Sequence, residues 1–271
     1  MPRGDKDLIK VYPLCFPSME EQQKIAAALS SLDDLITAQN AKLAALQAHK
    51  RGLMQGLFPA EGETVPKLRF PEFQEAGEWE EKKLKDIASI SSGSTPLRSN
   101  PKFFTNANIP WVKTTDLNNS FISVTEESIN SNARPRINPQ ESVLVAMYGG
   151  FNQIGRTGIL KMPAATNQAL SVLITDKGKV LPLYLLLWLN AQVYKWKSIA
   201  SSSRKDPNIT SKDVANFLIW YPSLAEQQKI ANCLSSLDNR ITAQSQKIEA
   251  LKLHKKGLMQ NLFPVAAEPT V

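Results

Sequence analysis

Apolar residues recur at every third or fourth position in two long segments of this 271-residue chain, one near each end. Such spacing places them on one face of a helix, and a single seven-residue frame continues over about five heptads in each segment. The pattern therefore predicts two long helices, each with an apolar stripe. The residues expected to pair the helices are Ile25, Leu29, Leu32, Ile36, Leu43, Leu46 and Leu53 in the first, and Ile230, Leu234, Leu237, Ile241, Ile248, Leu251 and Leu258 in the second.

Polar residues interrupt both stripes at matching places, Gln39 and Lys50 in the first and Gln244 and Lys255 in the second. A glutamine in such a stripe can fix the register of two helices, or it can be a tolerated defect in a loose stretch. The sequence leaves both interpretations open. It also leaves open whether the two stripes meet each other or a helix of a partner.

The two segments are copies of one another, because residues 17–59 align with residues 222–264 at a constant offset of 205 and about two-thirds of the pairs are identical. Both copies begin with Pro-Ser and have a glutamate three residues after the serine, which favours a capping box such as Ser223 with Glu226. Both end in Phe-Pro, which favours a helix stop. Each helix would have about 38 residues and a length of about 57 Å.

The stretch between the copies has a different pattern. Short runs of apolar and β-branched residues, bounded by Gly, Asn, Pro or Asp, predict strands at 109–114, 121–125, 142–147, 157–160, 169–174 and 217–221. Helical spacing predicts one helix over 181–200, and a smaller turn-and-helix unit begins at 209. Residues 80–91 look like a short helix or the start of a strand. The fold class is therefore α+β, with short strands predominating.

Charge is concentrated in this middle part. The chain has a net charge of +7, and residues 87–212 hold 14 Lys and Arg against 6 Asp and Glu, whereas the first copy is neutral and the second carries +3. A basic domain between less charged helices favours a polyanionic partner such as DNA or RNA, the alternative being a merely soluble basic surface.

Other features exclude several classes of protein. No apolar run is long enough for a transmembrane helix, and the N-terminus has no apolar signal segment, so no membrane partner is expected. The two cysteines, Cys15 and Cys233, lie far apart in dissimilar contexts, which argues against a disulfide framework and is compatible with a cytoplasmic location.

Loops between the predicted strands gather positive charge and amide side chains. Arg and Lys bind guanine edges or phosphates, and Asn and Gln bind adenine edges. For any single residue an ordinary solvated loop is an equal alternative, and it is the clustering that favours DNA. The candidates for DNA contact are Arg98, Lys102, Lys113, Arg134, Arg136, Tyr148, Asn152, Gln153, Arg156, Arg204 and Lys205.

The sequence contains no recognisable catalytic, cofactor or metal motif. Residues 108–111 resemble the Asn-Pro-Pro-aromatic motif of adenine methyltransferases, but Ile109 stands where the first proline should be. A glycine-rich loop for S-adenosylmethionine is missing, and both histidines lie on the predicted helices. We therefore expect no catalytic residues, no cofactor and no metal.

Several motifs resemble the specificity subunit of type I restriction–modification enzymes. Both helical copies contain Glu-Gln-Gln-Lys-Ile-Ala at the start and Gly-Leu-Met-Gln-x-Leu-Phe-Pro at the end. The middle part resembles that family's target-recognition domain at residues 92–96, 109–111, 148–155, 166–169 and 221–227. The resemblance extends over essentially the whole chain, in order.

This resemblance implies an antiparallel coiled coil of the two helices and one mixed α/β target-recognition domain. The implied division is a remnant of a recognition-domain tail at 1–16, conserved helical regions at 17–59 and 222–264, the recognition domain at 60–221 and a tail at 265–271. The family's usual subunit has two recognition domains, whereas this chain has one complete domain, as in a shortened or naturally half-sized subunit.

The resemblance further implies that the chain directs other subunits to a bipartite site in double-stranded DNA and performs no catalysis itself. Methyltransferase (modification) subunits would bind the helices, the restriction motor–nuclease subunit would join indirectly, and a second copy of the chain could restore two-fold DNA reading. The alternative is a non-catalytic coiled-coil scaffold, or a regulatory or decoy protein of the restriction complex. The basic middle part argues against a DNA mimic, which should be acidic.

Overall fold

In the computed structural model, which describes residues 16–201 and 208–263, the chain divides into two units. One comprises Met1–Lys50 together with Ser236–Val271, and the other comprises Arg51–Ser235. Apart from Phe16, the segment expected to be a recognition-domain remnant lies outside the described residues, as does the expected C-terminal tail.

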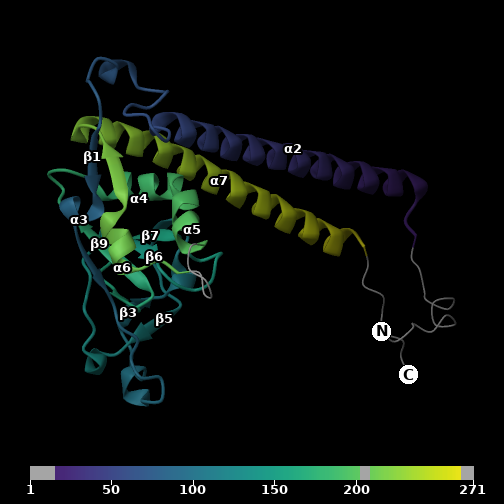
Figure 1. Cartoon of the computed structure of the whole chain (residues 1–271). Coiled ribbons are helices and arrows are strands. Elements are labelled where there is room, and N and C mark those ends of the chain that lie inside the picture. The colour runs from purple at the N-terminus through teal and green to yellow at the C-terminus, as the bar shows by residue number, and fades with distance from the viewer. Residues whose placement is uncertain (1–15, 202–207, 264–271) are drawn as a thin grey trace. The chain divides into compact units, whose positions relative to one another are not determined.

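Two long helices, α2 (Met19–Leu57) and α7 (Leu224–Leu262), run side by side (Figure 1), and their parts up to Lys50 and from Ser236 onward belong to the first unit. Lys50 Nζ lies 2.5 Å from a carboxylate oxygen of Asp238, and Lys255 Nζ lies 2.6 Å from Asp33 Oδ2. Because an early residue of α2 contacts a late residue of α7 and the reverse also holds, the helices are antiparallel. The predicted antiparallel helix pair is confirmed.

A pair of glutamines lies between these two ion pairs. Gln244 Nε2 donates hydrogen bonds to Gln39 Oε1 at 2.9 Å and to the Gln39 carbonyl at 3.1 Å. Gln244 is only 7% exposed, so its amide would lack a partner if the helices slipped by one turn. Of the two interpretations left open, the structure supports the one in which the glutamines fix the register.

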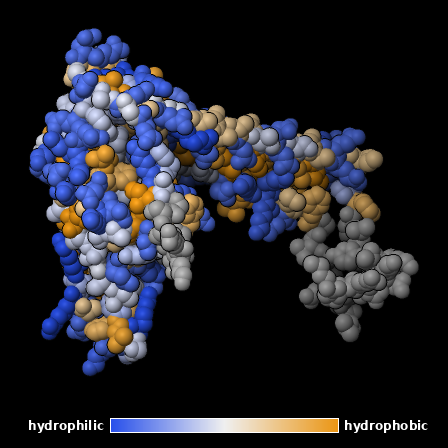
Figure 2. All heavy atoms as spheres, viewed as in Figure 1, coloured by the Kyte–Doolittle hydropathy of each residue, from blue (hydrophilic) through white to orange (hydrophobic). Residues whose placement is uncertain are grey.

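Apolar residues of the stripes are covered to different degrees. Leu237 and Ile248 are buried in the first unit, and Ile25, Leu29, Leu32, Ile36, Leu43, Leu46, Ile241 and Leu251 are half-buried. Figure 2 shows apolar and hydrophilic residues interspersed along these helices. Leu53, Ile230 and Leu234, three more of the residues expected to pair the helices, pack in the core of the second unit.

The second unit contains three sheets. The largest has the order β2-β9-β6-β7-β4, in which only β4 and β7 are parallel neighbours. A second has the order β5-β3-β8, and a third pairs β1 with β10. The strands are β1 (Glu80–Lys83), β2 (Ala88–Ser92), β3 (Ile109–Val112), β4 (Ser120–Ile122), β5 (Glu127–Ile129), β6 (Val143–Ala146), β7 (Thr157–Leu160), β8 (Ala165–Thr166), β9 (Leu170–Thr175) and β10 (Leu218–Tyr221).

Shorter helices complete this unit. They are α3 (Leu84–Ile87), α4 (Pro182–Ala191), α5 (Val193–Ser201) and α6 (Ser211–Asn216), with 3-10 turns η1 (Pro71–Phe73), η2 (Pro101–Phe103), η3 (Thr114–Asp116) and η4 (Ser131–Ala133). The prediction of a single helix over 181–200 is wrong in one respect, because the helix is interrupted at Gln192, between α4 and α5. The Gln192 N–H is shared between the carbonyls of Trp188 and Leu189, which tightens the last turn of α4.

The core of the second unit lies between the large sheet and α4. All four residues of β6 are buried, and so are Tyr184 and Trp188 of α4. Phe58, just after α2, packs edge-to-face against the rings of Tyr184 and Trp188, with centroids 5.8 and 5.7 Å apart. The last residues of the first helical copy therefore form part of this core.

The first turns of α7 are also buried in the second unit. Glu226 is 1% exposed, and its carboxylate accepts two hydrogen bonds of 2.8 Å from the guanidinium of Arg69, which raises the Arg69 pKa. Gln227 accepts from the Leu181 N–H at 2.9 Å and donates to the carbonyls of Lys179 and Pro222 at 2.9 and 2.8 Å. A buried carboxylate and a buried amide are thus both fully partnered.

These contacts correct one part of the predicted capping box. The Glu226 N–H does donate to Ser223 Oγ, at 3.4 Å, but the Glu226 carboxylate binds Arg69 and not the backbone of the cap. In the other copy, Gln22 donates to the Pro17 carbonyl at 2.8 Å, just as Gln227 donates to Pro222. Glu21, however, is exposed to solvent, so the two copies have the same sequence but different surroundings.

Replacing Glu226 with alanine should lower the free energy of unfolding of the second unit by about 3–5 kcal/mol, because Arg69 would be left as an unpaired and largely buried charge. Intrinsic tryptophan fluorescence during urea unfolding reports on this unit, since all five tryptophans lie within Arg51–Ser235.

The matched control is Glu21→Ala at the equivalent position of the other copy, which should change the free energy of unfolding by less than about 0.5 kcal/mol. Similar losses for the two variants would contradict the assigned role of the Arg69–Glu226 pair.

Candidate functional site

Four loops meet at one end of the two larger sheets of the second unit. We call residues 93–98, 113–116, 148–153 and 167–168 the loop cluster; they follow β2, β3, β6 and β8, respectively. Strands β2 and β6 both run antiparallel to β9, so their carboxyl ends lie beside its first residues. Strands β3 and β8 are parallel, so their carboxyl ends also coincide.

Hydrogen bonds hold these loops together. The Ser94 N–H donates to the Thr166 carbonyl at 3.0 Å, and the Asn167 N–H donates to the Val112 carbonyl at 3.0 Å. The hydroxyl of Thr95 is hydrogen-bonded to Gln168. Gly93 permits the approach, because a β-carbon there would lie 1.8 Å from the Thr166 carbonyl oxygen. The cluster is therefore a defined surface in which segments distant in sequence touch.

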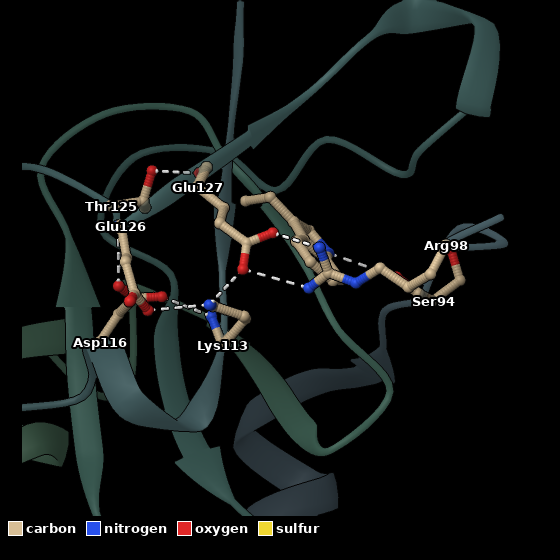
Figure 3. Close-up of polar contacts among 8 residues, drawn as sticks. Ser94, Arg98, Lys113, Asp116, Thr125, Glu126 and Glu127 are labelled. Carbon is tan, nitrogen blue, oxygen red and sulfur yellow. Dashed lines mark hydrogen bonds and ion pairs between the residues drawn. The ribbon is translucent and has the colours of Figure 1, made fainter. Parts of the chain in front are cut away.

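An ion-pair network joins two loops of the cluster to residues 126–127 (Figure 3). The two terminal nitrogens of Arg98 lie 2.6 and 3.1 Å from the two carboxylate oxygens of Glu127. The same guanidinium lies over the rings of Phe104 and Trp111, at 5.0 and 5.1 Å from their centroids. Lys113 Nζ binds Glu127 at 2.6 Å. Arg98 thus stacks on two rings while it binds a carboxylate in the planar geometry that suits it.

Two further carboxylates extend the network. Lys113 Nζ also lies 2.8 Å from Glu126 Oε2, and Asp116 accepts the backbone N–H groups of Lys113 and Glu126 at 2.7 and 3.0 Å. Hydrogen bonds from Arg98 and then from Lys113 lower the pKa of Glu127 to about 2. Two of the cations selected as DNA contacts are therefore engaged by acidic side chains of the same domain, and the five charged groups together carry one net negative charge.

The remaining selected residues fall in three places. Tyr148, Asn152 and Gln153 lie in the loop cluster, and Arg156 is held beside it by its backbone bonds to Gln153 and Ala146. Lys102, Arg134 and Arg136 belong instead to a second group of loops, around η2 and η4, where the Asn130 N–H donates to the Phe103 carbonyl at 2.7 Å. Arg204 and Lys205 lie outside the described residues.

Among the described residues, Lys102, Arg134, Arg136 and Arg156 make no ion pair, unlike Arg98 and Lys113. Their charge is therefore not neutralised by a nearby carboxylate. Figure 2 shows that hydrophilic residues dominate the visible surface of this unit. These four cations are the better candidates for binding an anion.

Sequence reasoning overlooked several residues of this region. Glu127 was missed as a partner of Arg98 because it lies on β5, a three-residue strand with no apolar alternation. Phe151 was also missed, although it is 45% exposed at the tip of loop 148–153. The sequence did contain one signal for it, an aromatic residue directly after two glycines.

No group of three or more His, Cys, Asp or Glu side chains that could hold a metal ion is found in the described ranges. None of the helices in those ranges is both long enough and apolar enough to cross a membrane.

Replacing Glu127 with glutamine should lower the free energy of unfolding by about 1 kcal/mol at neutral pH, the usual upper range for partly exposed ion pairs. The folded pKa of about 2 lies below the ordinary glutamate pKa of 4.5, so the stabilisation is complete above about pH 4.5 and disappears as the pH falls toward 2. Urea unfolding curves of the two proteins should therefore converge over that interval.

The exposed Glu75, which has no ion pair within the described structure, provides the control. Glu75→Gln should match the wild type at every pH, and a difference between wild type and Glu127→Gln that did not shrink in acid would refute the network's assigned role.

Comparison with known proteins gives a consistent result. Residues 76–253 match the family model described as type I restriction modification DNA specificity domain. The MjaIX specificity subunit of Methanocaldococcus jannaschii is 31% identical over 69% of this chain and 44% of its own length. The MjaVIII specificity subunit of the same organism is 27% identical over 97% of this chain and 64% of its own length. The chain thus spans roughly half to two-thirds of the length of these relatives.

Solved structures show the same fold. The HsdS subunit from Thermoanaerobacter tengcongensis superposes with a TM-score of 0.62 and 18% identity, covering 92% of this chain and 60% of that one. The type I S subunit from M. genitalium superposes with a TM-score of 0.61 and 15% identity, covering 92% of this chain and 62% of that one.

Proposed function

Because the chain belongs to the family of type I restriction modification DNA specificity domains, we propose that it recognises a DNA sequence for a restriction–modification system. The match over residues 76–253 carries this proposal, since it includes every strand from β1 to β10 and most of α7. In this proposal residues 60–221 are the recognition domain, and residues 17–59 and 222–264 are helical regions that connect it to other subunits. The chain would select the DNA sequence, and its partner subunits would catalyse the reactions.

The loop cluster and the neighbouring cations supply the surface for DNA. Loops held on a rigid sheet can place amide and guanidinium groups against base edges, and cations without a carboxylate partner can bind phosphates. Of the selected residues, we assign the phosphate contacts first to Lys102, Arg134, Arg136 and Arg156. Arg98 and Lys113 would bind DNA only if their ion pairs with Glu127 opened or if DNA approached the outside of the network.

The partners follow from the same proposal. Methyltransferase subunits would bind the helices α2 and α7, and the restriction motor–nuclease subunit would be recruited through them. The alternative, a scaffold or decoy of the restriction complex that does not bind DNA, differs in one respect that can be measured: it would give no salt-dependent DNA binding.

The complex of the chain with the methyltransferase subunit of its system should bind duplex DNA, and affinity should fall steeply as salt is raised. Reversing the charge of Arg134, Arg136 and Arg156 to glutamate should weaken binding at least tenfold and reduce the salt dependence. Fluorescence anisotropy with labelled duplex DNA, and methylation by the complex, are the measurements.

The control reverses three cations that belong neither to the loop cluster nor to the loops around η2 and η4, namely Lys67, Lys82 on β1 and Lys85 on α3, which gives the same change in net charge. This control should bind DNA nearly as tightly as the wild type. A complex that forms but neither binds nor methylates DNA would support the scaffold or decoy alternative.

We also propose that two copies of the chain act together on a bipartite site. The support is that one end of each helix is buried in the recognition domain while the repeated sequence at its other end is exposed. Glu226 and Phe58 are buried, whereas their equivalents Glu21 and Phe263 are exposed, the latter by 50%. A second recognition domain could cover these exposed copies.

Light scattering on the complex should accordingly give a mass that contains two copies of this chain. The double variant Glu21→Ala and Gln22→Ala should shift that mass toward one copy. In the two-copy arrangement these side chains would contact the second recognition domain, and in the first unit they contact no recognition domain. A mass corresponding to one copy in the wild-type complex on DNA would refute the two-copy arrangement.

A further inference from the structure

The loop 148–153 presents two aromatic side chains to solvent. Tyr148, two residues after the buried strand β6, is 42% exposed. Phe151, directly after the two glycines, is 45% exposed. A phenylalanine gains about 1.5–3 kcal/mol when it is fully buried, so an exposed one at a loop tip gives up much of that stabilisation. Within loop 148–153, Phe151 is the more exposed of the two rings.

The loop has a defined shape that places the ring there. Gly149 and Gly150 have φ angles of +113° and +85°, which favour glycine, and the Gln153 N–H closes the turn by donating to the Gly150 carbonyl at 2.9 Å. Directly after the turn, Ile154 is buried in the core, and Gly155 is so close to Trp196 that a β-carbon would lie 2.7 Å from it. The tip is therefore held from both sides.

Two cations lie close to this loop, one over the Phe151 ring and one just after the loop in sequence. The ammonium group of Lys197 on α5 lies over the Phe151 ring at 5.1 Å from its centroid. From residue 142 to residue 175 the sequence contains no Asp or Glu, and Arg156 lies just after the loop. Arg156, which makes no ion pair among the described residues, can bind a phosphate while the neighbouring base stacks on the apolar Phe151 ring.

We propose that Phe151 inserts between two base pairs of the recognised DNA and unstacks that step, with Tyr148 packing at its side. This inference rests on the proposed function. Apolar wedges of this kind kink DNA and make recognition depend on how easily a given step deforms. Phe151 would then contribute to specificity without reading a base edge, in addition to the hydrogen-bonding side chains selected from the sequence.

The complex with the methyltransferase subunit and its DNA provides the test. Phe151→Ala should weaken binding to the target duplex roughly tenfold, in the range for loss of one stacking contact, and Phe151→Leu should recover only part of it. Phe151→Trp should retain binding, and the fluorescence of the new indole should be quenched when DNA is added. Permanganate reactivity of thymines should show one unstacked step with the wild type and lose it with Phe151→Ala.

Phe121 is a matched control, because it is 38% exposed and Lys161 lies over its ring at 4.6 Å, but it lies on β4 and not in the loop cluster. Phe121→Ala should bind DNA and unstack the step as the wild type does. Unchanged DNA binding by Phe151→Ala would overturn the inference and leave the proposed function intact. Loss of methyltransferase binding by Phe151→Ala alone would also overturn it, and would show that the ring contacts protein. A wild-type complex that binds no DNA would overturn the proposed function itself.

Discussion

The second unit depends on one buried charge. The carboxylate of Glu226 is almost completely removed from water, and a charge in that position is tolerated only if it is paired. Arg69 supplies the pair from the segment that follows α2, and the adjacent Gln227 binds the backbone on both sides of residue 180, just before α4. The first turn of α7, the segment after α2 and the start of α4 are thereby fixed to one another, and α4 in turn covers the sheet on which the loop cluster stands.

Charge is also organised within the loop region, where two groups of cations differ in what surrounds them. Arg98 and Lys113 are held by Glu127, and their hydrogen bonds lower its pKa to about 2, so the carboxylate stays ionised in mild acid as well as at neutral pH. Arg134 and Arg156 have no such partner among the described residues. A net positive charge counted from the sequence therefore overstates what is available to a polyanion, because part of it is used to fasten the β3–β5 sheet.

The long helices could be predicted from the sequence because their heptad pattern extends over many turns and occurs twice. Strands such as β6 and β7 could be predicted because each is a continuous apolar or β-branched run bounded by turn residues. Strands β5 and β8 could not, since each has only two or three residues and depends on β3 for its pairing. The break at Gln192 was hidden because apolar residues continue on both sides of it. The pairing of Arg98 with Glu127 joins residues 29 positions apart, and no local pattern indicates it.

The repeat is imperfect at one position where the difference has a structural meaning. Gly56 lies so close to Leu68 that a β-carbon there would be 2.5 Å from the leucine side chain, whereas the second copy has Asn261 at the equivalent position. A leucine could not occupy the same place against Asn261 without displacement. A second copy of the chain that covered the other helix ends would therefore have to place its Leu68 segment differently against Asn261, so the two ends of the helix pair cannot be packed in the same way even though their sequences are nearly the same.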